Sequence, residues 1–434
     1  MKISAQCDRQ DIELAVPDDA TVYASSFPPP LPCPADRIVE AVRRPIGSAS
    51  LRDLLARRRP GNVVVVASDI TRPIPYAQFL PQLLAELESA GVPREQILIL
   101  IATGMHRPGT ADERRQMFGP EVVRDYRIAD HSADTDCDLV EIPGTSRAGA
   151  RVRLNWHFVE AGFRLLTGLV EPHLMAGFSG GRKAVCPGLC ALETVRMFHG
   201  YRFLADPRAT NGVLAGNPCH EEALSIARLA GVDFSLNVTL NERREIVAVF
   251  AGDLEAAHEH ACRFVDAHAC PAVRQEADVV VTSAGGYPLD ATFYQCVKGM
   301  ISCLPAVRKG GVILLFGGCR EGIGSPEYEE LMRNHAGRWR AFLKEIEQTE
   351  TVVRDQWQFQ VQARALERVG QENLYFVTDG LPQEQLDALS VHGVAASPGG
   401  VEAKVQDLID RFADDGRSLA VIPEGPYCTP MTPS

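Results

Sequence analysis

The chain has 434 residues, enough for two domains, and its hydrophobic fraction of 45% and charged fraction of 23% are ordinary for a globular protein. A formal net charge of -12 argues against a nucleic-acid-binding protein, whose binding surface is basic. Because the N-terminal residues are polar and no apolar run reaches the length of a bilayer span, we expect neither a signal peptide nor a membrane partner.

The N-terminal part of the chain predicts short elements joined by loops. Residues 2–7 and 11–15 have the pattern of short strands. The segment 26–34 contains three consecutive prolines, which predict an extended linker or surface loop. Helical patterns follow over residues 37–43 and 51–58.

The next segments predict a parallel sheet with helices between its strands. Residues 62–67, NVVVVA, form an unalternating β-branched run that is typical of a parallel strand buried on both faces. A helix over 78–90 and a second apolar strand over 96–102 follow, and Thr110 then begins a capping box for a short helix. A third strand begins at residue 163 and extends to 166 or a little beyond.

Polar side chains follow each of these three strands directly. Asp69 and Arg72 come after the first strand, His106 after the second and His173 after the third. In open α/β sheets, ligands bind beyond the carboxyl ends of the strands. We therefore expect these four side chains to face a single crevice.

The stretch from Thr167 to Gly200 is the strongest candidate for a site. It sets two histidines and a lysine, His173, His199 and Lys183, among closely spaced glycines. Glycine lets a backbone approach a ligand and adopt conformations closed to other residues. The alternative interpretation is a glycine-rich turn with solvated polar residues, and this stretch taken alone does not separate the two.

Two short motifs in this stretch suggest other chemistry. GFSGG, residues 177–181, matches the G-x-S-x-G nucleophile motif of α/β-hydrolases, which would make Ser179 the nucleophile. However, the preceding strand ends well before Ser179, whereas a hydrolase needs its serine at a sharp strand-to-helix turn. GFSGGRKA also resembles a phosphate-binding loop, but the glycine–lysine spacing is wrong and Ala184 stands where Ser or Thr should bind magnesium.

The twelve cysteines are scattered along the chain without a CxxC pair. Cys186 and Cys190 are four residues apart, but no second pair completes a zinc set, so we expect packing thiols. Free thiols are typical of a reducing compartment, and the sequence therefore predicts a cytoplasmic protein.

A second α/β unit begins near Ala277, after a helical and mixed segment that starts at residue 205. Its expected elements are a strand with a glycine turn over 277–286, strands over 311–318 and 374–378, and helices over 291–308, 326–348 and 357–369. A last strand over 418–422 is expected to return to the first domain. We thus predict an N-terminal catalytic domain of residues 1–272 plus 415–434 and a C-terminal domain of residues 273–414 that contributes substrate contacts.

With these motifs assembled, nearly the whole chain resembles the nickel-dependent lactate racemase family. The resemblance rests on several long motifs in the right order: SDITRP (68–73), TGMHR (103–107), EPH (171–173), AGFSGGRKAVCPG (176–188), His199 and YQCVKGM (294–300). It implies an α/β fold of two domains with largely parallel sheets and an active-site cleft between them. It also implies a nickel-pincer nucleotide, a pyridinium mononucleotide whose two sulfur-containing arms hold nickel.

The family's residue roles carry over to matching positions of this sequence. The resemblance implies cofactor contacts from Asp69, Ile70, Thr71 and Arg72, a cofactor link at Lys183 that is a thioamide where it is covalent, and nickel ligation by His199. It assigns His106 and His173 as the acid/base pair. Substrate contacts are implied for Arg72, Tyr294, Gln295, Lys298 and Trp357, the last as an aromatic wall of the pocket.

The residue types suit the activity that the resemblance implies, racemisation at C2 of a 2-hydroxy acid. The C2 hydrogen is hardly acidic, and passing it as a hydride to a pyridinium ring avoids a carbanion. The hydroxyl proton must leave at the same time, which suits histidine, and two histidines on opposite sides would serve the two enantiomers. Imidazole is a good nickel ligand, and Arg72 and Lys298 supply positive charge for an anionic nucleotide or carboxylate.

Lactate is the first expected substrate, and malate, phenyllactate or a sugar acid are alternatives. We expect cofactor-biosynthesis proteins as partners. Two other function classes stay open on the sequence: a serine hydrolase that uses Ser179, and a non-catalytic carrier or sensor of the nickel nucleotide. The acid/base pair of His106 and His173 argues against a carrier, because a carrier needs no such pair.

Overall fold

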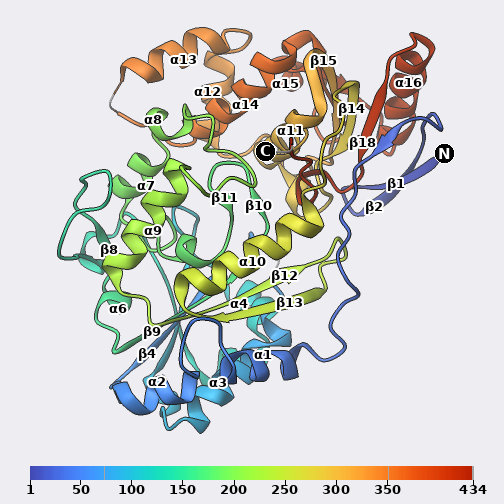
Figure 1. Ribbon diagram of the computed structural model, residues 1–434. Helices are drawn as coiled ribbons and strands as arrows, with labels where there is room; N and C mark the ends of the chain where they lie inside the picture. The colour runs from blue at the N-terminus through green and yellow to red at the C-terminus, as the bar shows by residue number, and fades with distance from the viewer. Residues whose placement is uncertain (73, 350, 433–434) are drawn as a thin grey trace. The chain divides into compact units, whose positions relative to one another are not determined.

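The computed structural model describes residues 1–72, 74–349 and 351–432, so Pro73 of the SDITRP motif and the last two residues of the predicted N-terminal domain lie outside the described residues. The chain divides into two compact units (Figure 1). The first unit comprises residues 27–198 and 213–265, and the second comprises residues 1–26, 199–212 and 266–434.

The first unit is built on a six-stranded sheet with the strand order β13-β12-β9-β4-β5-β6. All neighbours pair in parallel except the edge strand β13, which runs antiparallel to β12. The strands are β4 (Val63–Ser68), β5 (Ile97–Ala102), β6 (Arg127–Asp130), β9 (Phe163–Leu169), β12 (Phe234–Leu240) and β13 (Ile246–Gly252). Two small antiparallel pairs accompany it: β7 (Leu139–Glu141) with β8 (Arg153–Asn155), and β10 (Pro172–His173) with β11 (Gly177–Phe178).

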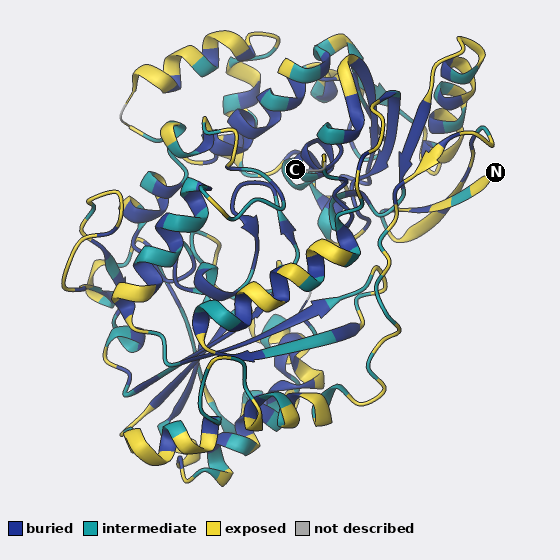
Figure 2. Cartoon of the chain, in the orientation of Figure 1, coloured by how far each residue is buried: buried dark blue, intermediate teal, exposed yellow. Residues whose placement is uncertain are grey.

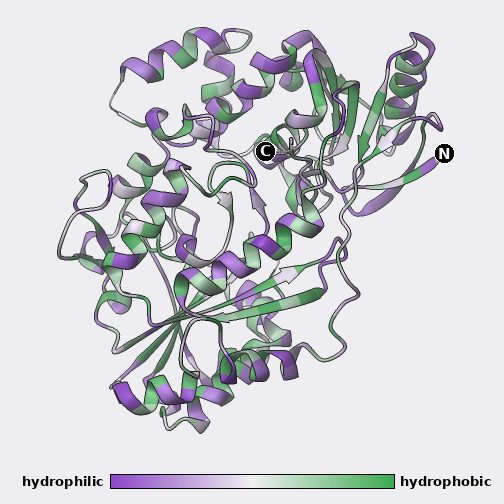
Figure 3. Cartoon of the chain, viewed as in Figure 1, coloured by the Kyte–Doolittle hydropathy of each residue, from purple (hydrophilic) through white to green (hydrophobic). Residues whose placement is uncertain are grey.

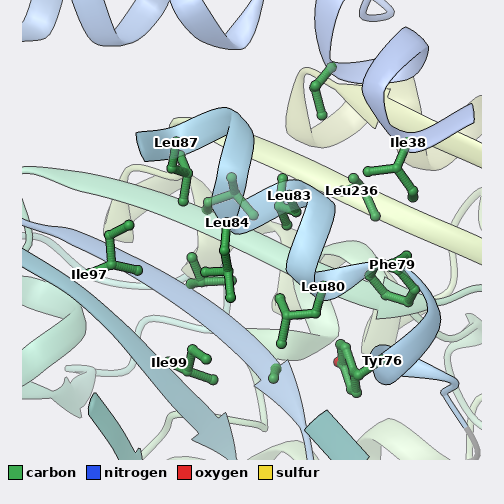
Figure 4. Packing of buried hydrophobic residues seen from close by; sticks show 14 of the residues in the cluster. Ile38, Tyr76, Phe79, Leu80, Leu83, Leu84, Leu87, Ile97, Ile99 and Leu236 are labelled. Atoms are coloured by element: carbon green, nitrogen blue, oxygen red, sulfur yellow. The ribbon is translucent and has the colours of Figure 1, made fainter. Parts of the chain in front are cut away.

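One face of this sheet is covered by α1 (Pro34–Arg43), α2 (Leu51–Arg58) and α3 (Leu80–Ser89) (Figure 1). The apolar residues of α3 recur at helical spacing and point toward strand residues such as Ile97 and Ile99 (Figure 4). β4 and β5 are buried along nearly their whole length, while the outer faces of the helices are exposed (Figure 2). This matches the sequence expectation of parallel strands buried on both faces.

Further helices belong to this part of the chain. They are α4 (Ala111–Phe118), α5 (Pro120–Asp125), α6 (Trp156–Val159), α7 (Leu192–Phe198), α9 (Pro218–Ala230) and α10 (Leu254–Ala269), the last of which runs into the second unit. α4 begins with the predicted capping box. The Thr110 side chain accepts a hydrogen bond from the Glu113 amide, and the Glu113 side chain accepts one from the Thr110 amide.

The second unit holds another six-stranded sheet, with the order β17-β16-β15-β14-β18-β3 and every neighbour parallel. Its strands are β3 (Thr21–Val22), β14 (Ala277–Ser283), β15 (Val307–Phe316), β16 (Leu374–Thr378), β17 (His392–Ala395) and β18 (Leu419–Ile422). The hairpin of β1 (Lys2–Cys7) and β2 (Gln10–Ala15) packs its apolar side chains into the same core.

The place of β18 corrects one expectation. We expected the last strand to return to the first domain, but β18 pairs with β14 in the sheet of the second unit. The four residues of β18 are all buried, and a short apolar strand of this kind fits any parallel sheet, so its partner is fixed by tertiary packing. The predicted domain boundaries otherwise stay a prediction.

The helices of the second unit carry both polar and apolar residues (Figure 3), and α16 packs its apolar residues into the core with the sheet. They are α8 (Tyr201–Leu204), α11 (Phe293–Ser302), α12 (Pro326–Asn334), α13 (Trp339–Gln348), α14 (Gln356–Val369), α15 (Gln383–Leu386) and α16 (Val401–Asp414). The helix expected over 291–308 is thus shorter, because a turn at Leu304–Ala306 leads directly into β15. Both sheets are largely parallel, as the sequence predicted.

Candidate functional site

Asp69 begins the loop that follows β4, at the carboxyl end of the central strand of the first unit. Its carboxylate is buried, and one oxygen, Oδ1, accepts from the Thr71 amide at 3.1 Å and from the Thr71 hydroxyl at 2.6 Å. The Arg72 guanidinium donates to the Thr71 hydroxyl at 3.1 Å. Ile70 packs against the core beneath the loop. The loop therefore fixes the Asp69 carboxylate with a defined orientation.

The second oxygen of Asp69 contacts His106, which follows β5 on the adjacent strand. Asp69 Oδ2 and His106 Nδ1 lie 2.5 Å apart and share a hydrogen bond. The His106 side chain is 45% exposed and that of Asp69 only 9%, so the imidazole is reachable while its partner is sheltered. The expected convergence of side chains at this sheet edge is confirmed for Asp69 and His106. For His173 it stays a prediction.

The charge state of Asp69 follows from its surroundings. Burial raises the pKa of the carboxyl, but the hydrogen bond from His106 and the positive charges of His106 and Arg72 outweigh burial, so the pKa lies below its usual value. Asp69 is therefore an anion near neutral pH. A carboxylate that accepts from an imidazole N–H holds the ring in one orientation and one tautomer.

His173 lies at the end of the β10–β11 hairpin, where it pairs with Gly177. Its imidazole is half-buried, and its Nδ1 accepts hydrogen bonds from the Met175 and Ala176 amides, both at 3.2 Å. Two main-chain amides thus position this ring through Nδ1. The two histidines predicted as an acid/base pair are held by opposite kinds of partner.

Ser179, the candidate nucleophile of the hydrolase alternative, is buried in the same hairpin. Its hydroxyl donates to the Leu169 carbonyl at 2.8 Å and accepts from the Glu171 amide at 3.0 Å. A nucleophilic serine needs its proton directed at a base. The Ser179 hydroxyl is instead committed to main-chain groups, which favours a structural role in tying the hairpin to the end of β9.

The glycines of this stretch are explained by protein contacts rather than by a ligand. A Cβ at Gly177 would lie 2.2 Å from the Val213 carbonyl oxygen, and one at Gly188 would lie 2.4 Å from the Ala184 carbonyl oxygen. We expected these glycines to let the backbone approach a ligand. Close packing of the chain against itself accounts for both positions, so the glycine density alone was weaker evidence for a site than the histidines and lysine.

Arg182, which the sequence reading did not single out, is a buried cation under the hairpin. Its guanidinium donates to the Ala176 carbonyl at 2.7 Å and approaches His258 Nε2 at the same distance. Burial lowers the pKa of Arg182 to about 10. A buried arginine bonded to carbonyls stiffens the turn that carries His173 and Lys183, and its charge acts on its neighbours because the surroundings exclude water.

Lys183 follows Arg182 in the short helical turn Gly181–Ala184 and is half-buried. Burial lowers the pKa of its amine to about 7, and the positive charges of Arg182 and Arg72 add to the effect. The Lys183 nitrogen lies 5.5 Å from the centre of the Phe198 ring. A lysine that is largely neutral just above pH 7 is a nucleophilic amine, unlike an ordinary surface lysine.

This pKa predicts how Lys183 reacts in the protein without cofactor. Because the depressed pKa leaves the amine neutral above about pH 7, acylation of Lys183 by a small anhydride should reach half its maximal rate near pH 7. Peptide mass spectrometry at a series of pH values measures the extent at each of the six lysines, with exposed Lys309 as the internal reference. A profile for Lys183 that follows that of Lys309 up to high pH would contradict the prediction.

In the second unit, α11 carries the residues predicted to contact the substrate. Tyr294, Gln295 and Lys298 are the half-buried positions of a helix whose other residues are buried, so they share one face, as their spacing predicted. The Gln295 Oε1 atom is buried and has no hydrogen-bond partner among the described residues. A buried acceptor without a hydrogen bond destabilises the folded state unless a ligand or a water molecule donates to it.

His199, the predicted nickel ligand, begins the segment 199–212 of the second unit. Its ring lies 4.7 Å from the ring of Trp357, which is buried at the start of α14. The Trp357 indole N–H donates to the Tyr294 hydroxyl at 2.9 Å. The structure thus brings together His199, Trp357 and Tyr294, which the sequence had assigned to the metal and to the substrate.

The glutamines of α14 are contacts that the sequence reading missed. Gln358 donates to the Tyr294 carbonyl at 2.5 Å, and Gln360 donates to the Tyr201 carbonyl at 3.1 Å. All four glutamines of the QWQFQVQ run are buried. Strict alternation of polar and apolar residues is the pattern of a half-buried strand and marks no face of a helix. Only the tertiary contacts reveal that these amides join α11 and the segment 199–212 to α14.

The described residues also show where possible metal ligands, cysteines and apolar helices lie. Within residues 1–72, 74–349 and 351–432, no three His, Cys, Asp or Glu side chains are grouped so that they could hold a metal ion. The twelve cysteines are thiols that form no disulfide, and Cys186 and Cys190 are buried, as expected for packing thiols. In the same described ranges, none of the helices combines the length and apolar character needed to cross a bilayer.

Comparison with known proteins gives matches along most of the chain. Residues 7–212 match the family model described as lactate racemase N-terminal domain, and residues 272–426 match the lactate racemase C-terminal domain. A lactate racemase of Thermoanaerobacterium thermosaccharolyticum is 33% identical over 391 residues, covering 90% of this chain and 89% of that protein. One from Lactiplantibacillus plantarum is 34% identical over 380 residues, covering 87% and 86%.

Solved structures give the same picture. The lactate racemase apoprotein of Thermoanaerobacterium thermosaccharolyticum superposes with a TM-score of 0.89 at 30% identity, covering all of both chains. A protein of Thermotoga maritima, 18% identical with a TM-score of 0.69, covers 94% of this chain and all of its own and shares the fold. The match to the apoprotein over the full length supports the two-unit α/β architecture.

Proposed function

Because this chain belongs to the lactate racemase family, we propose that it interconverts the two enantiomers of a 2-hydroxy acid, with lactate as the first substrate. The observation that carries the proposal is the Asp69–His106 pair at the carboxyl ends of β4 and β5, which provides an oriented base. Both relatives that match most of the chain are lactate racemases, which favours lactate over malate, phenyllactate or a sugar acid.

We propose a nickel-pincer nucleotide as the cofactor, and the residues present fit it. The amine of Lys183 has the lowered pKa that covalent attachment requires, and Arg72 contributes positive charge to the same region. His199 offers one imidazole, and no group of three side chains in the described part of the chain would complete a nickel site, so the remaining ligands would come from the sulfur arms. When bound, the cofactor supplies a pyridinium ring that can take a hydrogen with its electron pair.

Side chains of the protein would take the proton of the substrate hydroxyl and bind the substrate carboxylate. A base must take the proton of the substrate hydroxyl, and His106, backed by the Asp69 carboxylate, is built for this. His173 is proposed as the second member of the acid/base pair. Lys298 and Gln295 on α11 would bind the substrate, since an ammonium pairs with a carboxylate and the buried Gln295 amide end requires a partner.

A racemisation experiment in deuterated water tests the proposal. Protein made together with the cofactor pathway should convert L-lactate to the racemate, and the product should keep its original hydrogen at C2. The reason is that a hydride transferred within the site does not exchange with solvent, whereas a carbanion would take deuterium. NMR of the product at C2 gives the result, and substantial deuterium there would exclude the hydride mechanism and the cofactor assignment with it.

A panel of single-enantiomer acids identifies the substrate. Lactate, malate, phenyllactate and a sugar acid are incubated with the same preparation, and loss of optical purity is followed by chiral chromatography. Lactate should have the highest kcat/KM. Conversion of none of the four would contradict the proposed racemase.

A further inference from the structure

We propose that Asp290 is a positioning residue for substrate binding, because its buried carboxylate ties the tip of the N-terminal hairpin and the loop after β15 to the start of α11. The proposal rests on the proposed function, in which Gln295 and Lys298 of α11 bind the substrate. Asp290 is itself buried and is not assigned a contact with the substrate. It acts through the place in which it holds α11.

One oxygen of the Asp290 carboxylate joins two segments that are far apart in the sequence. Its Oδ2 atom accepts from the Asp8 amide at 2.7 Å and from the Gly318 amide at 2.9 Å. Asp8 lies in the turn between β1 and β2, and Gly318 lies in the loop that follows β15. Because both backbone donors must stay within hydrogen-bond distance of the same atom, the carboxylate fixes the two loops relative to each other.

The main chain around Asp290 carries this connection into α11. Asp290 lies in the short turn that precedes the helix, and its carbonyl accepts from the Cys319 amide at 2.8 Å. The first two amides of α11 donate to carbonyls of the same loop, those of Gly322 and Ile323, at 3.1 and 2.9 Å. A helix cannot satisfy its first amides by itself, so the loop after β15 determines where α11 begins.

The hairpin tip packs closely on the loops that Asp290 joins. The Tyr287 amide donates to the Asp8 carbonyl at 2.7 Å, and the Arg320 guanidinium donates to the Asp8 carboxylate at 2.9 Å. A Cβ at Gly318 would lie 2.8 Å from the Asp8 Cβ, so no side chain fits between them. The hairpin tip thus occupies the place beyond the carboxyl ends of β14 and β15, where open α/β sheets bind ligands, and supports α11 from there.

The Asp290 carboxyl is costly to the fold. Burial raises its pKa, although the hydrogen bonds from the Asp8 and Gly318 amides favour the ionised form. The other oxygen, Oδ1, is also buried and has no hydrogen-bond partner among the described residues. A site that served stability alone would be better filled by a neutral residue. The position that this carboxyl imposes on α11 explains its presence.

Substitutions of Asp290 should therefore change substrate affinity more than turnover. Asp290→Ala removes the acceptor from both loops, so Gln295 and Lys298 lose their fixed position, and this weakens binding of substrate and transition state alike. KM for lactate should rise at least about tenfold while kcat changes less than about threefold, with nickel content unchanged. Asp290→Asn keeps an oxygen that accepts from both amides and should restore most of the affinity.

Hydrogen–deuterium exchange followed by mass spectrometry tests the positioning on the full chain made without cofactor. Peptides that cover the start of α11 and the loop 318–323 should exchange at least about tenfold faster in Asp290→Ala, and at the unmodified rate in Asp290→Asn. Asp278→Ala is the matched control. Asp278 accepts from the Ser418 amide and hydroxyl at 2.9 and 2.7 Å at the other end of β14, so its loss weakens the same sheet without reaching α11.

Unchanged exchange at the start of α11 in Asp290→Ala, or an equal rise there in Asp278→Ala, would overturn the role of Asp290. Faster exchange with an unchanged KM, or equal KM values in Asp290→Ala and Asp290→Asn, would overturn the link to substrate binding. If Asp290→Ala does not fold, Asp290→Ser replaces it, because its shorter side chain also loses both amides. An unmodified chain that racemises no 2-hydroxy acid would contradict the proposed function, and the exchange result would still decide whether Asp290 holds α11.

Discussion

Protein made without the cofactor pathway should show no racemisation of lactate at all, and the same chain made with the pathway should be active. The physical reason is that no side chain in the described part of the molecule can take the C2 hydrogen as a hydride, and deprotonating C2 by an imidazole is too unfavourable. Chiral chromatography and nickel analysis of the two preparations give the result. Full activity of the nickel-free chain would refute the proposed function.

His199→Ala should reproduce this loss in protein made with the pathway, because His199 is the proposed nickel ligand from the chain. Its nickel content should fall in parallel with its activity. His260→Ala provides the matched control, because it removes an exposed histidine of α10. Retention of nickel together with loss of activity in His199→Ala would assign this residue to the reaction instead of the metal.

His106→Gln should lower kcat/KM for racemisation by roughly 10²–10⁴-fold, the usual contribution of a general base. Glutamine keeps the size and polarity of the side chain but offers no lone pair of suitable basicity. Because the two enantiomers have equal free energy, the loss in kcat/KM must be the same in both directions, while kcat and KM can change separately for each enantiomer. Steady-state kinetics with both enantiomers as substrate measure this.

Two controls make the His106 result decisive. The nickel content and thermal unfolding of His106→Gln should equal those of the unmodified chain, since His106 is half exposed and bonds only through Asp69 among the contacts described here. An exposed-site variant, His260→Gln, should keep full activity. A loss of less than about tenfold in His106→Gln would exclude it as the main base.

The sequence predicted those parts of the fold that local patterns encode. Continuous apolar runs identified β4 and β5, and the capping box at Thr110 identified the start of α4. The polar residues that follow the strands identified His106 and Asp69 as neighbours at one edge of the sheet. In each case a short stretch of chain carries the whole signal.

Elements that depend on distant contacts were missed. The strand β12 lies inside the first sheet, yet it contains three buried polar residues, Ser235, Asn237 and Thr239. Asn237 is accommodated because its side-chain oxygen accepts from the Gly181 amide at 2.9 Å. No local sequence pattern predicts that Asn237 pairs with the Gly181 amide. For the same reason the sequence predicted a cofactor contact for Asp69 and did not predict its hydrogen bond to His106.

The β10–β11 hairpin has a consequence for how this family can evolve. A mutation can delete a carboxylate, but it removes a peptide N–H only by introducing proline. The donors to His173 belong to the backbone of Met175 and Ala176, so almost any side-chain replacement at these two positions preserves them. The partner of His106 is a side chain, so a single substitution at Asp69 removes it. In relatives whose substrate or rate has changed, we therefore expect the substitutions to lie around His106. The main-chain hydrogen bonds to His173 should be preserved.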